Sequence, residues 1–289
     1  MEKVGVIGLG NIGGSIVKRL ISLNYLVVVY DIDSKKREEY RKEKVNVANS
    51  ITEILENNIN YLITSLPNDD AVMNVLNDNK DVFKTFNLNI TLIELSTILP
   101  QTIKKLQRNF TELNIKIIDC PISGGPIEAK QGNLNLIVSG EEQVYVQSKK
   151  ILKTIGTNIN YVGKEIGEAK AIKLINNIMT MGNVLVASEA FSLGLRFGIK
   201  PDTLYSILSQ TGGTSHHFKK RFPKVLNNDY SPLFSIRLGE KDLNLAKEWA
   251  NSNGFESYVT NFISEQYSKA SEKKLGNEDI VSIIKCFLN

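Results

Sequence analysis

Short apolar runs alternate with longer helical or polar stretches through the first half of the chain. The apolar runs predict strands at residues 4–7, 26–30, 45–48, 61–66, 91–95, 116–119, 134–139 and 159–162. Helical or polar stretches separate several of them, at residues 34–44, 69–77, 100–113 and 143–155. This alternation predicts an α/β unit built on a mainly parallel, doubly wound sheet of the Rossmann type.

Residues 167–197 predict one long helix that carries two apolar stripes. The first stripe runs through Ile172, Ile175, Met179, Gly182, Val186, Ala190, Leu193 and Phe197, and the second through Leu174, Ile178, Met181 and Leu185. Apolar residues on two faces predict a helix that is buried over most of its girth. Lys173, Asn177 and Thr180 form a polar line on it, spaced i, i+4 and i+7. Because burying an unpaired ammonium is costly, we expect Lys173 to be either paired or used in chemistry.

The chain after this helix has only helical patterns, at residues 202–208, 238–252, 258–272 and 279–287. The sequence therefore predicts a dinucleotide-binding domain over residues 1–163 and an all-α domain over residues 164–289, led by the long interdomain helix. Lys173 would lie near the seam between the two domains, which is where ligand clefts often form.

A glycine-rich turn follows the first predicted strand. It consists of Gly8, Leu9, Gly10, Asn11, Ile12 and Gly13. In a GxGxxG turn between a strand and a helix, the glycines allow a tight bend, close approach of a pyrophosphate, and close helix packing. Asp31 ends the second strand, 18 residues past Gly13, where an acid can bind the adenosine ribose. An acid there favours NAD, while the nearby Lys35, Lys36 and Arg37 leave NADP open. Asp33 is a second candidate for the ribose role.

Ligands of doubly wound sheets bind outside the carboxyl ends of the strands, so the residues just past those ends are candidates. They are Leu66 and Pro67, Ser96 and Thr97, and residues 121–125. In the last group, Ser123, Gly124 and Gly125 could hold a carboxylate with a hydroxyl and consecutive backbone amides, or could form a plain turn.

Composition limits the remaining function classes. The chain has 289 residues, of which 42% are apolar and 23% charged, and a net charge of +4 without a long run of one sign. We therefore expect no nucleic-acid or membrane partner, and no stretch approaches the ~18 apolar residues of a membrane span. Two distant cysteines and an N-terminus without a long apolar run favour a cytoplasmic location. His216 and His217, in a predicted loop, have no third ligand beside them, so no metal site is expected.

Four separated motifs together resemble the β-hydroxyacid dehydrogenase family, which includes 3-hydroxyisobutyrate dehydrogenase, tartronate semialdehyde reductase and the cofactor domain of 6-phosphogluconate dehydrogenase. Residues 8–13 resemble the family's cofactor motif and residues 119–125 its substrate motif. Residues 167–177 resemble the catalytic motif GxGxxxKxxNN, and residues 241–246 resemble KDLxLA. The resemblance covers nearly the whole chain.

The resemblance implies a role for individual residues. Lys173 would be the catalytic general acid and base, and Asn177 would orient the substrate. Ser123, Gly124 and Gly125 would hold its carboxylate. Ser96 or Thr97 would contact the nicotinamide side, and Lys241 would reach the cofactor and substrate. A homodimer or homotetramer is also implied.

Three residues depart from the family pattern: Asn24 and Ala169 replace glycines, and Cys120 replaces a small residue. None of them removes a reacting group. We therefore expect hydride transfer between NAD, or NADP, and a small β-hydroxy acid such as 3-hydroxyisobutyrate. Reduction of a small semialdehyde or glyoxylate, imine reduction, and a non-catalytic dinucleotide-binding module are the alternatives.

Overall fold

The computed structural model describes residues 2–86 and 89–288 of the chain. It divides into two compact units, Met1–Lys173 and Leu174–Asn289. The division falls inside one continuous helix, α9 (Glu168–Arg196). The boundary predicted from the sequence, between residues 163 and 164, coincides instead with the end of strand β9.

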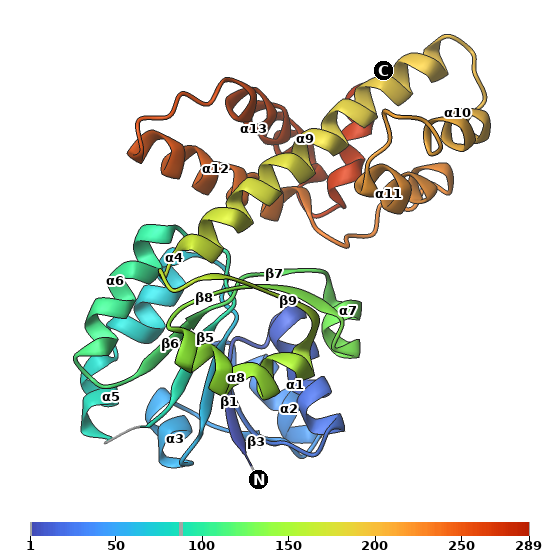
Figure 1. Ribbon diagram of the computed structural model, residues 1–289. Helices are drawn as coiled ribbons and strands as arrows, with labels where there is room; N and C mark the ends of the chain where they lie inside the picture. Colours follow the sequence, from blue (N-terminus) through green and yellow to red (C-terminus); the bar gives the residue numbers. More distant parts are fainter. Residues whose placement is uncertain (1, 87–88, 289) are drawn as a thin grey trace. The chain divides into compact units, whose positions relative to one another are not determined.

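A single sheet forms the centre of the N-terminal unit (Figure 1). Its strands are β1 (Lys3–Ile7), β2 (Leu26–Tyr30), β3 (Asn46–Val47), β4 (Tyr61–Thr64), β5 (Thr91–Glu94), β6 (Lys116–Asp119), β7 (Ile122–Ser123), β8 (Leu134–Ser139) and β9 (Gly156–Gly163). The order is β3-β2-β1-β4-β5-β6-β8-β7, with β9 also paired to β8. The pairs from β3 to β6 are parallel, whereas β8 runs antiparallel to β6 and β7. This confirms the mainly parallel sheet and adds β7, which is too short to show a period.

Helices cover both faces of this sheet (Figure 1). One face packs against α1 (Asn11–Ser22), α2 (Ser34–Lys42), α7 (Pro126–Gln131) and α8 (Glu142–Ile155). The other packs against α3 (Ile51–Glu56), α4 (Asp69–Val72) with its π-helical extension η1 (Met73–Asn77), α5 (Lys80–Thr85) and α6 (Pro100–Thr111). Neighbouring strand residues therefore enter opposite cores, as Leu62 and Ile63 do. The short helices α3, α5 and α7 were not predicted, because six residues hold too few periodic positions.

The C-terminal unit is helical, as its sequence pattern predicted. Besides most of α9 it contains α10 (Pro201–Leu208), α11 (His216–Leu226), α12 (Ile236–Ser252), α13 (Tyr258–Ala270), η2 (Ser271–Leu275) and the 3-10 helix η3 (Ile280–Cys286). The predicted loop at His216 and His217 is wrong, because these residues open α11. Ser215 caps that helix by accepting a hydrogen bond from the Phe218 N–H at 3.0 Å.

Helix α9 buries one apolar stripe and exposes the other. Met181 and Leu185 of the second stripe lie in the core of the C-terminal unit. Val186 and Phe197 of the first stripe are 69% and 86% exposed. The prediction that most of the helix girth is buried is therefore wrong for the single chain. Only one face of the helix contacts that core, and periodicity cannot tell a face that meets a core from one left open.

Helix α9 also corrects the expectation about membrane spans. Among the described residues it is the one helix long and apolar enough to cross a membrane by length and composition. Long core helices of soluble proteins pass the same test, so this property alone assigns no membrane.

Candidate active site

The glycine-rich turn lies at the carboxyl end of β1, at the start of α1. Gly8 has a φ of +95°, and a Cβ there would meet the Ser65 carbonyl oxygen at 2.2 Å. A Cβ on Gly13 would lie 1.9 Å from the Gly8 carbonyl oxygen. These two glycines are therefore required by the fold itself. A Cβ on Gly10, by contrast, would meet nothing within 4 Å.

The open space at Gly10 fits a pyrophosphate. Gly10 is the N-cap of α1 and has no side chain to cap the helix, so Asn11, Ile12 and Gly13 begin it with backbone amides that a phosphate could accept from. The described residues thus fit a dinucleotide at this turn, as the sequence pattern predicted.

Asp31 is buried beside this turn. Its Oδ2 accepts a hydrogen bond from the Leu9 N–H at 2.7 Å, and its Oδ1 accepts one from the Asp33 N–H at 2.9 Å. The carboxylate therefore fixes the glycine-rich turn, which sequence reasoning did not foresee. An ionised carboxylate has about four acceptor sites, so capacity remains for a ribose hydroxyl. Asp33, the second candidate, caps α2 by accepting from the Lys35 N–H at 2.9 Å.

The basic residues after β2 also have partners near Asp31. Lys36 Nζ lies 3.5 Å from Asp31 Oδ2, and Arg37 Nη1 donates to the Asp31 carbonyl oxygen at 2.6 Å. Lys36 thus lies close to the carboxylate that would bind the ribose, and Arg37 is bonded to the backbone of the same residue.

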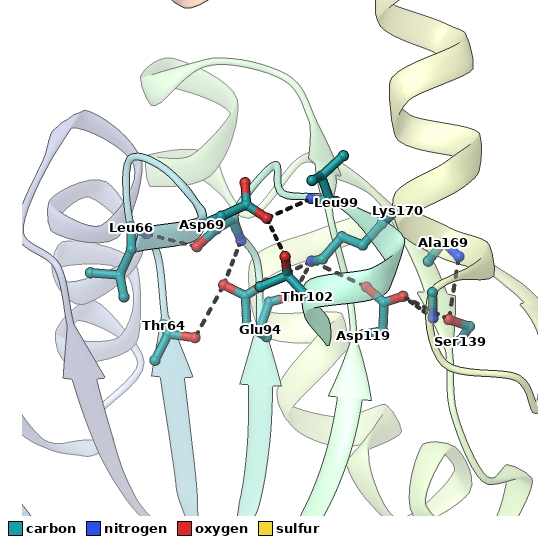
Figure 2. Close-up of polar contacts among 12 residues, drawn as sticks. Thr64, Leu66, Asp69, Glu94, Leu99, Thr102, Asp119, Ser139, Ala169 and Lys170 are labelled. Atoms are coloured by element: carbon teal, nitrogen blue, oxygen red, sulfur yellow. Dashed lines mark hydrogen bonds and ion pairs between the residues drawn. The ribbon is translucent and has the colours of Figure 1, made fainter. Parts of the chain in front are cut away.

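The ends of β4 and β5 are joined by hydrogen bonds (Figure 2). The Leu66 N–H donates to Ser96 Oγ at 2.8 Å, and the Ser96 N–H donates to Glu94 Oε1 at 3.0 Å. Ser96 is buried at 4% exposure, whereas Thr97 is partly exposed and Pro67 is exposed. Ser96 therefore holds two strand ends together, and of the Ser96–Thr97 pair Thr97 is the one more open to a ligand.

The predicted carboxylate-binding loop follows β6. Ser123 lies on the short strand β7, and Gly124 has a φ of +134°. Gly125 caps α7, and its N–H donates to Glu128 Oε2 at 2.9 Å. The Gly125 amide is thus already bonded to the Glu128 side chain, as in one half of a capping box, which leaves the Ser123 hydroxyl and the Gly124 amide as the groups best suited to bind an anion.

The first two turns of α9 carry two lysines with different environments. Lys173 is partly buried. Lys170, one helical turn earlier, is fully buried and forms ion pairs with Glu94 Oε2 at 2.7 Å and Asp119 Oδ1 at 3.1 Å (Figure 2). Burial alone would lower the pKa of Lys170, but the two carboxylates and their hydrogen bonds together raise it. Sequence reasoning missed Lys170, although a lysine between alanines at a predicted buried helix start was a signal.

In the C-terminal unit, Asp242 contacts two residues that the sequence predicted for the site, Asn177 and Lys241. Asn177 Nδ2 donates to Asp242 Oδ2 at 2.6 Å, and Lys241 Nζ lies 2.8 Å from Asp242 Oδ1. The Asn176 amide donates to Asn177 Oδ1 at 3.1 Å. These contacts fix the orientation of the Asn177 amide and leave it one N–H and one acceptor site. Asp242 was part of a recognised motif but had no predicted role.

The structure accommodates each of the three residues that depart from the family pattern, and burial changes the pKa of one histidine. Asn24 has a φ of 61°, a left-handed conformation that asparagine tolerates in place of glycine. Ala169 is buried and donates its N–H to Ser139 Oγ at 3.3 Å. Burial raises the pKa of the Cys120 thiol, which makes it a packing residue rather than a nucleophile. Burial, with help from nearby Arg221, lowers the pKa of His217 to about 4.

The described residues show no group of three or more His, Cys, Asp or Glu side chains that could hold a metal ion.

Comparisons with known proteins identify the family of this chain. Residues 3–163 match the family model described as the NAD binding domain of 6-phosphogluconate dehydrogenase. Residues 167–287 match the model described as NAD-binding of NADP-dependent 3-hydroxyisobutyrate dehydrogenase. The mitochondrial 3-hydroxyisobutyrate dehydrogenase of Mus musculus is 29% identical, over 98% of this chain and 86% of its own length. The 2-(hydroxymethyl)glutarate dehydrogenase of Eubacterium barkeri is 28% identical, over 98% and 94%.

A solved structure supports the same relationship. The crystal structure of 3-hydroxyisobutyrate dehydrogenase from Salmonella typhimurium superposes with a TM-score of 0.86 at 25% identity, covering 99% of this chain and 100% of that one.

Fold, glycine-rich turn and relatives together define an NAD(P)-dependent oxidoreductase that acts on a CH–OH group. More closely, the chain belongs to the β-hydroxyacid dehydrogenase family, and hydride transfer on a small hydroxy acid is the reaction that fits it. The resemblance seen in the sequence is thereby confirmed for the fold, the class of enzyme and the NAD(P) cofactor.

Proposed function

We propose that this enzyme oxidises a short β-hydroxy acid of the 3-hydroxyisobutyrate type with NAD, and that Lys173 is its general base. The observation that carries the proposal is the placement of Lys173 one helical turn after Lys170, whose ammonium contacts the end residues of β5 and β6. Ligands of such sheets bind beside those strand ends, so an amine there would be within reach of a bound alcohol.

In the proposed reaction the protein has two tasks: it positions the substrate against the cofactor, and it transfers one proton. When bound, the cofactor accepts the hydride from the alcohol carbon. Lys173, as the neutral amine, would take the hydroxyl proton, and as the ammonium it would return a proton to the carbonyl oxygen in the reverse direction. The Ser123 hydroxyl and the Gly124 amide would hold the substrate carboxylate. Asn177, held by Asp242, would orient the hydroxyl.

NAD is the preferred cofactor in this proposal, for two reasons. Asp31 would repel a phosphate on the ribose. Lys36 and Arg37, the cations that could attract such a phosphate, already contact Asp31.

The first test is nicotinamide reduction at 340 nm by the purified protein with NAD and then NADP. The substrates are 3-hydroxyisobutyrate, L-serine, glycerate, 3-hydroxypropionate and 4-hydroxybutyrate. We expect turnover of a 3-hydroxy acid with NAD, and a loss of about a thousandfold or more in Lys173→Ala, because general base catalysis and substrate placement are removed together. Lys153→Gln, which changes an exposed lysine on α8, is the matched control.

Two results would oppose the proposal. Unchanged turnover in Lys173→Ala would remove Lys173 from the catalytic role. Absence of turnover across the panel, with NADH binding intact, would favour the alternatives: reduction of a small semialdehyde, imine reduction, or cofactor binding without catalysis. Oxidation of NADH by succinic semialdehyde, tartronate semialdehyde, glyoxylate or a cyclic imine would distinguish them.

The proposal includes a homodimer or homotetramer in the cytoplasm. The exposed apolar stripe of α9, with Val186 at 69% and Leu193 at 72% exposure, supports self-association, because covering it would remove apolar surface from water. Light scattering that gave a monomer at micromolar concentration would contradict this. The free thiols of Cys120 and Cys286 support a reducing compartment, which cell fractionation would test.

A further inference from the structure

The ammonium group of Lys170 is fully buried inside the N-terminal unit. Its Nζ donates to the Glu94 carbonyl oxygen at 3.0 Å and forms ion pairs with Glu94 Oε2 at 2.7 Å and Asp119 Oδ1 at 3.1 Å. Three oxygen atoms therefore lie around an ammonium that has three N–H donors. The side chains of Lys170, Glu94 and Asp119 are each 0% exposed. The orientation of this ammonium is therefore fixed from three directions.

Stability alone does not explain such a cluster. One lysine and two carboxylates, formally +1 and −2, leave a net charge of −1 among side chains that have no solvent exposure. Apolar side chains of similar volume often fill a core at equal or greater stability than a buried ion cluster. Unlike apolar packing, the charged cluster fixes the orientation of its side chains, because each contact joins particular atoms at particular distances.

The cluster connects the first turn of α9 to several strand ends (Figure 2). On one side, Glu94 ends β5 and accepts from the Ser96 N–H, and Ser96 in turn holds Leu66 after β4. These segments are the ones proposed to lie along the cofactor.

On the other side, Asp119 ends β6, directly before the proposed carboxylate-binding loop. Its Oδ2 accepts from the Gly167 N–H at 2.9 Å and from Ser139 Oγ at 3.0 Å. Ser139, at the end of β8, accepts from the Ala169 N–H. The start of α9 is thus bonded to Asp119 and Ser139 through its backbone, and to Glu94 and Asp119 through the Lys170 side chain.

We propose that Lys170 is a positioning residue for the reaction: it locks the first turn of α9 onto the ends of β5 and β6, and so sets the place of Lys173 relative to cofactor and substrate. Lys173 follows Lys170 by three positions, and residues three apart on a helix are neighbours on one face. The inference rests on the proposed role of Lys173. Lys170 itself, being fully buried, contacts neither ligand.

The kinetic test compares Lys170→Met, Lys170→Gln and the double variant Lys170→Met/Glu94→Gln with wild type. The double variant keeps the formal cluster charge at −1, because it removes one positive and one negative group, and it guards against failure to fold. We expect kcat for 3-hydroxyisobutyrate to fall about 100-fold in Lys170→Met and in the double variant, because small misplacements of reacting groups have effects of that order. The KM for 3-hydroxyisobutyrate and the Kd for NADH should each stay within about threefold of wild type. NADH binding should be preserved because the glycine-rich turn is untouched.

Lys170→Gln is the conservative variant. An amide keeps two N–H donors, enough to bond one carboxylate and the Glu94 carbonyl oxygen. It should therefore restore part of the lost kcat, to within about tenfold of wild type. Lys153→Gln, on the exposed face of α8, should behave as wild type. A structural role alone would lower stability in these variants while each folded molecule turned over at the wild-type kcat.

A second arm does not depend on the substrate. Brief treatment of the whole protein with acetic anhydride, followed by peptide mass spectrometry, gives the acylation rate of Lys173 relative to Lys153. If Lys170 sets the environment of Lys173, this ratio should change by about threefold or more in Lys170→Met. Should wild type lack hydroxy-acid turnover, the proposed function fails, and this arm still decides the inference. A wild-type kcat, or where no activity is found an unchanged labelling ratio, would overturn the positioning role.

Discussion

Gly10 offers a test that separates cofactor binding from folding. A Cβ added at this position meets nothing within 4 Å, and the backbone φ of −67° is one that alanine adopts without strain. Alanine is a poorer N-cap than glycine, but it also lowers the entropy of the unfolded chain. Because the two effects offset, we expect Gly10→Ala to change the free energy of unfolding by less than about 0.5 kcal/mol.

The same methyl group would project into the space that fits the pyrophosphate. If the phosphate must retreat from the amides of Asn11 and Ile12, NADH should bind about 10–100 times more weakly, which corresponds to about 1.4–2.8 kcal/mol. Gly13→Ala is the matched contrast. Its Cβ would lie 1.9 Å from the Gly8 carbonyl oxygen, so the backbone must move, at a cost in folding stability of about 3 kcal/mol.

The assay pairs NADH fluorescence titration with urea unfolding of wild type, Gly10→Ala and Gly13→Ala. We expect Gly10→Ala to lose affinity at wild-type stability, and Gly13→Ala to lose stability. Wild-type NADH affinity in Gly10→Ala would refute the assignment of the open space to the pyrophosphate. A Gly13→Ala protein as stable as wild type would refute the argument from close packing.

Two further outcomes are expected. Asp31→Asn should weaken NAD binding about tenfold and relax the preference for NAD over NADP in steady-state kinetics. The amide can still accept from the Leu9 N–H, but it no longer repels a ribose phosphate. An unchanged NAD to NADP activity ratio would remove Asp31 from the ribose role. The pKa of His217 is lowered to about 4, so folding should lose about 1–2 kcal/mol as pH falls from 6.5 to 4. His217→Gln should flatten this part of the urea-unfolding profile, exposed His216→Gln should not, and equal acid sensitivity in His217→Gln would contradict the assignment.

Several features of the fold could be predicted because their signal is local. The strands of the parallel sheet are apolar runs, and the glycine-rich turn has a fixed spacing, so both were visible along the chain. The short helices α3, α5 and α7 and the strand β7 were missed because their few residues hold too little periodicity. The start of α11 was missed because its cap, Ser215, lies in a run that resembles a turn.

The candidate site divides in the same way. The GxGxxG turn, Asp31 and the position of Lys173 were apparent from residue types and spacing. That Asp31 also fixes the Leu9 amide, and that Asp242 holds Asn177, depend on groups brought together from distant positions, which no pattern along the chain encodes. The contacts of Glu128 with the Gly125 amide and of Lys241 with Asp242 are local, but their spacing alone does not show that the side chains meet.

The sequence by itself determined the class of fold, the cofactor-binding turn and the family, because these depend on periodicity and on motifs of neighbouring residues. The tertiary structure decided which face of α9 is buried and which lysine of its first two turns is enclosed. A stripe of apolar residues looks the same in sequence whether or not a core lies against it. The sequence does not show that Lys170 is the enclosed lysine, because its partners Glu94 and Asp119 lie 76 and 51 positions away from it along the chain.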